Sequence, residues 1–165
     1  MQAISFASVR TGQSLPPLVI AVTPSVIVAG ALASGDFEVV HHDVAAARAR
    51  GTPDIFMNIL TTNGYVQRFV NDWLAPAGQI RAIALRLGVP SYAGDTLTLT
   101  GIVTAKREEG GERLLEIAVT GTNSLGAHVN ATVAVALPLT ARCAMRPPSS
   151  ASAPRSSPRT PGAVN

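Results

Sequence analysis

An aspartate and a histidine five residues apart are the side chains of this sequence best suited to acid–base chemistry. Asp36 and His41 lie in the stretch SGDFEVVHHDVAAARARG, which follows an apolar segment. An imidazole titrates near neutrality and an ionised carboxylate accepts protons, so the two groups could divide acid and base work on one water molecule. A plainer interpretation also fits these residues: Asp36 caps a helix, and His41, His42 and Asp43 form its solvated first turn. Spacing alone leaves both interpretations open.

The residues around this pair resemble a known motif. Gly35-Asp36-Phe37 followed by His41 resembles the Gly-Asp-x-Asn-Pro-hydrophobic-His motif of MaoC-like (R)-specific enoyl-CoA hydratases, with Glu38 and Val39 in place of Asn-Pro. The later segments DIFMNILTTNGYVQRFVNDW and LRLGVPSYAGDTLTLTG extend the resemblance over residues from about 12 to 137. Together they resemble the small catalytic subunit of the heteromeric hydratases of bacterial steroid side-chain degradation.

The resemblance implies an active site. Asp36 would accept a proton from the water that attacks the 2,3 double bond of a bulky trans-enoyl-CoA, while His41 would hold that water and help to protonate the α-carbon. The thioester oxygen gains negative charge and needs donors, which a helix N-terminus supplies. Asn58 stands where the hydratases have the glycine of a Pro-Ile-x-His-Gly segment, and its backbone N–H is the candidate donor.

Cofactors and partners follow from the same resemblance. Coenzyme A is part of the substrate, so neither a separate cofactor nor a metal is expected. Arg81, Arg86 and Arg107 are available for the CoA phosphates, and nothing in the sequence selects among them. A second MaoC-like subunit is expected in a heterodimer or heterotetramer, or otherwise a homodimer.

Three other functions remain open. A homodimeric medium-chain (R)-enoyl-CoA hydratase would use the same residues. A hotdog thioesterase commonly places an acid on the central helix, but no acid lies between Asn58 and Asn71. A non-catalytic hotdog subunit would have no need of both Asp36 and His41, although the missing Asn-Pro pair keeps that function possible.

Composition narrows the class of protein. Arg142, Arg146, Arg155 and Arg159 lie beyond all ten acidic residues, so the rest of the chain carries nine basic against ten acidic side chains. The body therefore has no basic stripe typical of a nucleic-acid surface. Cys143 is the only cysteine, which fits a reducing cytoplasm, and prolines interrupt the apolar run from Leu15 to Leu32, which predicts neither a signal peptide nor a membrane span. The predicted domains are a MaoC-like hotdog domain, residues 1–141, and a disordered tail rich in Pro, Ser and Arg, residues 142–165.

Periodicity predicts an α+β fold. Val19–Thr23 reads as an edge strand, Ser25–Leu32 as an extended or helical lead-in, and Asn58–Trp73 as one long helix. The alternating segments that follow predict four successive strands joined as an antiparallel meander, 80–87, 96–106, 114–123 and 128–137. The resemblance implies a single hotdog fold, a curled antiparallel sheet wrapped around the long central helix. Within these elements, Gly64 suggests a close backbone approach and His128 a surface or interface position.

Overall fold

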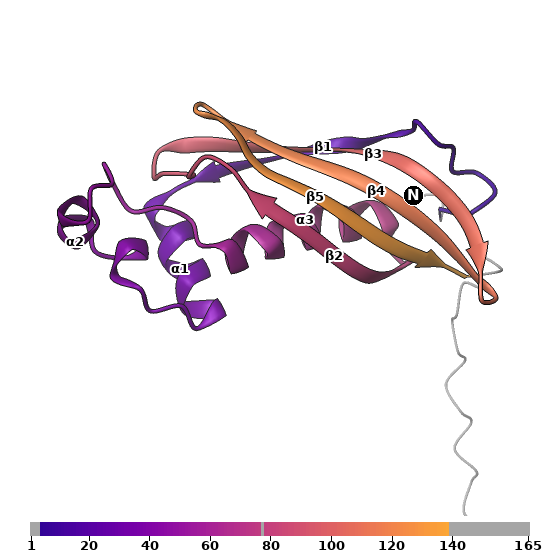
Figure 1. Cartoon of the computed structure of the whole chain (residues 1–165), viewed down its shortest axis with the longest axis horizontal. Helices are drawn as coiled ribbons and strands as arrows, with labels where there is room; N and C mark the ends of the chain where they lie inside the picture. The colour runs from indigo at the N-terminus through magenta and orange to yellow at the C-terminus, as the bar shows by residue number, and fades with distance from the viewer. Residues whose placement is uncertain (1–3, 77, 139–165) are drawn as a thin grey trace, which may run out of the picture.

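The structure, a computed structural model, describes residues 4–76 and 78–138 (Figure 1). The predicted domain end at residue 141 and the predicted tail lie outside the described residues. The elements in chain order are β1 (Ser14–Val22), α1 (Pro24–Ser34), the short 3₁₀ helix η1 (Val39–His41), α2 (Val44–Ala49), α3 (Ile59–Leu74), β2 (Gln79–Leu87), β3 (Asp95–Glu109), β4 (Glu112–Asn123) and β5 (Gly126–Leu137).

The five strands form one antiparallel sheet in the order β1-β3-β4-β5-β2. All four predicted strands after the helix are present, but the predicted meander is wrong for the first of them, because β2 pairs with β5 and not with β3. The segment between β2 and β3 is too long for a tight hairpin, which usually has two to five loop residues. Its first residues, Gly88 and Val89, continue the pairing with β5 through the carbonyls of His128 and Ala127. The chain then crosses to the far edge, where β3 pairs with β1.

Helix α3 lies against the concave face of the curled sheet (Figure 1), as the hotdog fold requires. Its buried residues recur at helical spacing and face the sheet: Thr62, Val66, Phe69, Val70 and Leu74. Their partners are buried residues of the three central strands, among them Leu99, Val103, Ile117, Val119, Val133 and Val135. At Gly101 the sheet accepts the Phe69 ring, since a Cβ there would lie 2.8 Å from Phe69 Cε1. The predicted fold class is confirmed.

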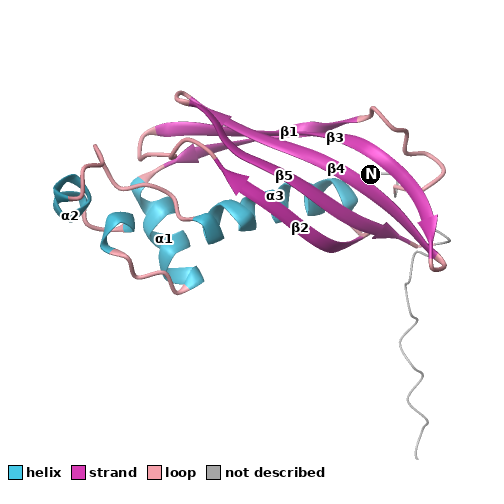
Figure 2. Cartoon of the chain, in the orientation of Figure 1, coloured by secondary structure: helices cyan, strands magenta, loops and turns pink. Residues whose placement is uncertain are grey.

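The shorter helices gather at one end of the sheet (Figure 2). The lead-in predicted as extended or helical is the three-turn helix α1. It begins after Thr23, whose hydroxyl accepts the N–H of Val26, and it ends at Gly35, where φ is 69°. Because Gly35 adopts the left-handed conformation, the chain turns away sharply just before Asp36.

Helices α1 and α3 approach closely at Gly30. A Cβ at this position would lie 2.3 Å from Thr61 Oγ1 and 3.0 Å from Thr61 Cβ. The close approach predicted at Gly64 is wrong for this chain, since a Cβ there would meet no non-neighbouring atom within 4 Å in the described part of the chain. The contact at Gly30 brings the end of α1 next to the start of α3.

Candidate active site

The structure brings Asp36 and His41 together. Asp36 follows the end of α1, His41 ends η1, and the distance from Asp36 Oδ2 to His41 Nε2 is 3.4 Å. The Asp36 side chain is 25% exposed and the His41 side chain 9%. The plainer interpretation, with Asp36 as a helix cap, is wrong: η1 has no side-chain cap, and Asp43 caps α2 by accepting the N–H of Ala46 at 3.0 Å.

The orientation of His41 follows from its contact with a carbonyl. Its Nδ1 lies 2.7 Å from the backbone oxygen of Phe56, which can only accept a hydrogen bond, so Nδ1 carries the proton. In the neutral imidazole, Nε2 therefore presents a lone pair towards Asp36. Phe56 is itself fixed by a bridge to Tyr92, and its ring meets the imidazole edge-on with the centroids 5.0 Å apart. The carboxylate oxygen and Nε2 then face each other across 3.4 Å, so that one water molecule beside them could contact both.

A contact that the sequence did not predict holds the Asp36 carboxylate. Asn58 Nδ2 donates to Asp36 Oδ2 at 2.9 Å and to Ser34 Oγ at 2.9 Å. This hydrogen bond is the main cause that lowers the pKa of Asp36 below its usual value. Burial of the carboxylate acts in the opposite direction, and the N–H of Glu38 and, when its ring is protonated, the charge of His41 lower it further. Asn58 is the N-cap of α3, a role that its residue type and position could have indicated. The side-chain contact with Asp36 spans 22 residues, so no local pattern could have indicated it.

The backbone at the start of α3 fits the predicted oxyanion donor. The N–H groups of Asn58, Ile59 and Leu60 donate to no acceptor among residues 4–76 and 78–138. Asn58 is only 3% exposed, and a buried donor without a partner costs free energy that a bound oxygen would recover. The predicted donor is therefore available in the structure.

Two hollows meet this cluster on opposite sides of α1. A cavity of about 210 Å³ contains Asp36 and is otherwise lined by His42 and four apolar residues, Val28, Ala31, Leu32 and Phe37. A larger apolar groove of about 630 Å³ lies between α1 and α3; its lining includes Val26, Ala29, Gly30, Ser34, Leu60, Gly64 and Tyr65. The Asn58 side-chain amide donates hydrogen bonds to one lining residue of each hollow, Asp36 in the smaller cavity and Ser34 in the groove.

His128 lies in the interior and not at the predicted surface or interface position. It is 1% exposed, and burial lowers its pKa, against the hydrogen bond to the Val89 carbonyl, which raises it. Nδ1 donates to that carbonyl at 2.7 Å, so the neutral ring accepts at Nε2 from the Thr62 hydroxyl, 2.9 Å away. The ring thus links β5 to Thr62 in the first turn of α3, whose hydroxyl also lies 3.2 Å from the Asn58 carbonyl.

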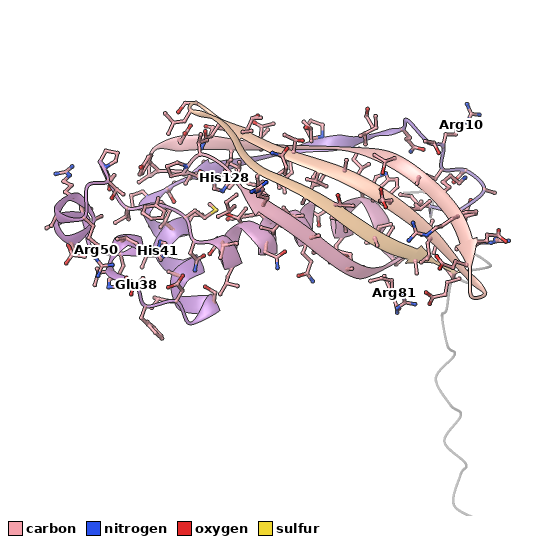
Figure 3. The ribbon with its side chains drawn as sticks, in the orientation of Figure 1. Arg10, Glu38, His41, Arg50, Arg81 and His128 are labelled. Atoms are coloured by element: carbon pink, nitrogen blue, oxygen red, sulfur yellow. The ribbon has the colours of Figure 1, made fainter. Side chains whose placement is uncertain are left out.

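Two of the three arginines predicted for CoA phosphates already have acidic partners. Arg81 pairs with Glu112 and lies at the opposite end of the molecule from His41 (Figure 3). Arg107, near the hairpin between β3 and β4, pairs with Glu109 at 3.1 Å, and Arg86 makes no ion pair within the described ranges. Of the three arginines labelled in Figure 3, Arg50 lies nearest His41, and it pairs with Glu38 at 2.6 Å.

Two searches of the described residues were negative. No group of three His, Cys, Asp or Glu side chains could hold a metal ion there. No helix among these residues is long and apolar enough to cross a membrane.

The family description "MaoC like domain" matches residues 7–124, and the chain belongs to this family. The 3-oxo-4,17-pregnadiene-20-carboxyl-CoA hydratase beta subunit of Mycobacterium tuberculosis is 49% identical over 126 residues, which cover 76% of this chain and 95% of that protein. The relationship confirms the predicted family and, with it, a hydratase-type enzyme.

Solved structures agree with the fold. A chain of the ChsH1-ChsH2 complex from Mycobacterium tuberculosis matches with a TM-score of 0.73 and 49% identity, over 78% of this chain and 98% of that chain. The R-hydratase PhaJ1 from Pseudomonas aeruginosa matches with a TM-score of 0.74 and 20% identity, over 82% of this chain and 86% of that chain. At this lower identity the second match supports the hotdog fold alone.

Proposed function

We propose that this chain is the catalytic subunit of a heteromeric hydratase that adds water across the 2,3 double bond of a bulky, steroid side-chain trans-enoyl-CoA. The observation that carries the proposal is the placement of Asp36 Oδ2 3.4 Å from His41 Nε2, with the His41 proton held on Nδ1 by the Phe56 carbonyl. The name and 49% identity of the mycobacterial hydratase subunit support the choice of substrate.

Asp36 and His41 would first orient the water. Two acceptors bind the two hydrogens of one water molecule and leave its oxygen lone pairs free for the β-carbon. As the new C–O bond forms, Asp36 takes one proton and the electrons of the double bond move towards the thioester. The proton then passes to the α-carbon on the same face with the help of His41, so that one water is added in total. A positioned acid or base contributes roughly 10²–10⁴-fold in rate.

The thioester oxygen would lie at the N-terminus of α3. Charge develops on this oxygen as the enolate-like transition state forms, and preorganised N–H groups stabilise it. The buried N–H of Asn58 is the proposed donor, and the positive end of the helix dipole acts in the same direction.

The groove between α1 and α3 is the proposed surface for the acyl group. Its volume of about 630 Å³ lies within the range of roughly 300–1,000 Å³ that is usual for small-molecule sites. Its lining is mostly apolar and includes Ser34, which the Asn58 amide joins to Asp36. With a bulky hydrocarbon body in this groove, the reactive end would extend past Ser34 to Asp36, which lines the smaller cavity.

A second MaoC-like subunit is proposed to pair with strand β2. Both β1 and β2 are edges of the sheet, but β1 carries Pro16 and Pro17, which lack the N–H groups that a further strand needs. Strand β2 has nine residues and no proline, and its apolar Ile83 and Leu85 are only half-buried. We further propose that the reaction needs neither a resident cofactor nor a metal, because the thioester itself supplies the electron sink, and that it takes place in the cytoplasm.

The test measures hydration of a short enoyl-CoA and of a steroid side-chain enoyl-CoA. The reaction is monitored by the decrease in enoyl absorbance. The chain is assayed alone and co-expressed with a MaoC-like partner such as that of the mycobacterial complex, each with Asp36→Ala and His41→Ala as variants. Turnover of the steroid substrate only with the partner, lost in both variants, is the expected result. Turnover of short substrates by the chain alone would instead indicate a homodimeric medium-chain hydratase. Turnover that survives both substitutions would show that this chain is not the catalytic subunit.

A further inference from the structure

The Asn58 side chain lies at the centre of the candidate site without being one of the reacting groups. Its orientation is determined at both ends. Oδ1 lies 2.8 Å from the backbone nitrogen of Thr61, whose N–H can only donate a hydrogen bond. Nδ2 lies 2.9 Å from Oδ2 of Asp36, and an ionised carboxylate can only accept one. Exchanging the amide O and N would break both contacts, so the two N–H hydrogens face Asp36 and Ser34.

The partners of Asn58 are themselves fixed. The Ser34 hydroxyl, which accepts one Asn58 N–H, donates back to the carbonyl of Gly30 at 2.8 Å, or to that of Ala31 at 3.1 Å, in the last turn of α1. Thr61 belongs to the first turn of α3 and contacts α1 at Gly30. The amide is thus held by the two helices whose crossing forms the site.

The Asp36 carboxylate has few other constraints. Among the residues that the structure describes, its Oδ1 accepts only the Glu38 N–H, at a long 3.3 Å, and its Oδ2 faces His41 at 3.4 Å. The Asn58 hydrogen bond of 2.9 Å is the shortest polar contact of this side chain with those residues. Without it, the carboxylate could rotate about χ2 away from His41, because that torsion is broad in aspartate.

We propose that Asn58 is a positioning residue for Asp36: its side-chain amide, fixed between α1 and α3, holds the carboxylate in register with His41. The inference rests on the proposed hydratase function and assigns a role to the Asn58 side chain that differs from the backbone N–H proposed for the oxyanion. In this chain the amide comes from the start of α3, whereas the motif position two residues after Asp36 is occupied by Glu38.

Two substitutions separate this role from helix capping. Asn58→Asp keeps the size of the side chain and remains a good N-cap, but it replaces the two N–H donors with a carboxylate beside Asp36. Asn58→Ser also caps the helix but is too short to reach Asp36. Asn71→Asp, which makes the same change at an exposed position later in α3, is the matched control.

The assay is hydration by the complex of this chain with its partner, measured from pH 5 to 9. Both Asn58 variants should lose about 10–100-fold in kcat, with KM changed less than about 3-fold, since a misplaced catalytic group costs rate more than binding. Two carboxylates in contact share a proton, so Asn58→Asp should also move the acid limb of the profile to higher pH. Both Asn58 variants should remain folded in the assay, with Asn58→Asp the less stable at neutral pH, because a carboxyl pKa raised in the folded state costs stability above that pKa. Asn71→Asp should leave activity and profile unchanged.

A second readout does not depend on turnover. With ¹³C-labelled aspartate in this chain, the Asp36 carboxyl should titrate at higher pH in both Asn58 variants than in the wild-type complex. If the wild type hydrates no enoyl-CoA, the proposed function fails, and this titration still decides whether Asn58 controls Asp36. An unchanged Asp36 titration in folded Asn58→Asp, or wild-type kcat and acid limb in that variant, would overturn the positioning role.

Discussion

Two helical glycines that line the same groove should respond differently to a single added methyl group. Gly64 lies in the middle of α3 with open space at the Cβ position, whereas a Cβ at Gly30 in α1 would lie 2.3 Å from Thr61 Oγ1. Alanine is favoured over glycine in a helix interior by about 0.5–1 kcal/mol, and this gain applies to both sites. The difference between the two variants therefore measures the contact at Gly30.

The contact at Gly30 cannot be relieved by a rotamer change alone. The Thr61 Cβ itself would lie 3.0 Å from the new methyl group, and a β-branched side chain has little χ1 freedom in a helix. The two helices would have to separate, and overpacking of this kind costs about 1–3 kcal/mol. Gly64→Ala should thus be more stable than wild type by up to about 1 kcal/mol, and Gly30→Ala less stable than Gly64→Ala by about 1–3 kcal/mol.

Urea unfolding of the chain, followed by the fluorescence of its single tryptophan, Trp73, gives the two free energies of unfolding. In a domain of this size each 1 kcal/mol also shifts Tm by roughly 2–4 °C. Gly30→Ala should in addition lower hydration activity, because the crossing places Asp36 beside Asn58. Equal changes for the two variants, or a loss of stability in Gly64→Ala, would refute the assignment of Gly30 as the crossing point and show that Gly64 is covered.

Two further predictions concern a histidine and an ion pair. The pKa of His128 is lowered in the folded state, so as pH falls below about 6.5 the histidine takes up a proton in the unfolded chain before it does so in the folded chain. The free energy of unfolding should therefore decrease with falling pH in this range, by at most about 1.4 kcal/mol per pH unit. Urea midpoints between pH 7.5 and 5.5 should show this slope, and its persistence in His128→Gln would assign it to another group. Glu38→Ala removes an exposed ion pair with Arg50 and should change the free energy of unfolding by less than about 1 kcal/mol. Its hydration rate should stay close to that of wild type, because Asp36 contacts the Glu38 backbone and not its side chain; a large loss of rate would mean that the Glu38–Arg50 pair holds the site.

The helices and strands could be predicted from the sequence more accurately than the order of the strands in the sheet. Alternation reports which face of a strand is buried, and it located β2 to β5 to within a few residues. It carries no information on which strand lies alongside, and succession in the chain predicts β2 next to β3. In the structure β2 pairs with β5. The connection from residue 88 to residue 94 first continues alongside β5 and then crosses the sheet, and this separates β2 from β3.

His128 shows how a local irregularity defeats a periodic pattern. Val129, Ala131 and Val133 are buried in β5, so strict alternation directs residue 128 outward. The register between β4 and β5 shifts at this point, where Gly121 pairs with Val129 and Thr122 with Ala127. The extra residue is His128, and a bulge of this kind can turn a side chain to the other face. The sequence around it gave no sign of the shift.

The replacement of Asn-Pro by Glu38-Val39 tests how far the motif determines the site. The turn after Asp36 still forms, because the His41 N–H donates to the Glu38 carbonyl at 3.0 Å and the Glu38 N–H donates to Asp36. The amide that contacts the carboxylate comes from Asn58, on the other side of the contact between Gly30 and Thr61. The position of Asp36 thus depends on how closely two helices approach as well as on its own loop. This explains why the motif could indicate the proposed reacting residues, Asp36 and His41, while their support could be found only in the folded chain.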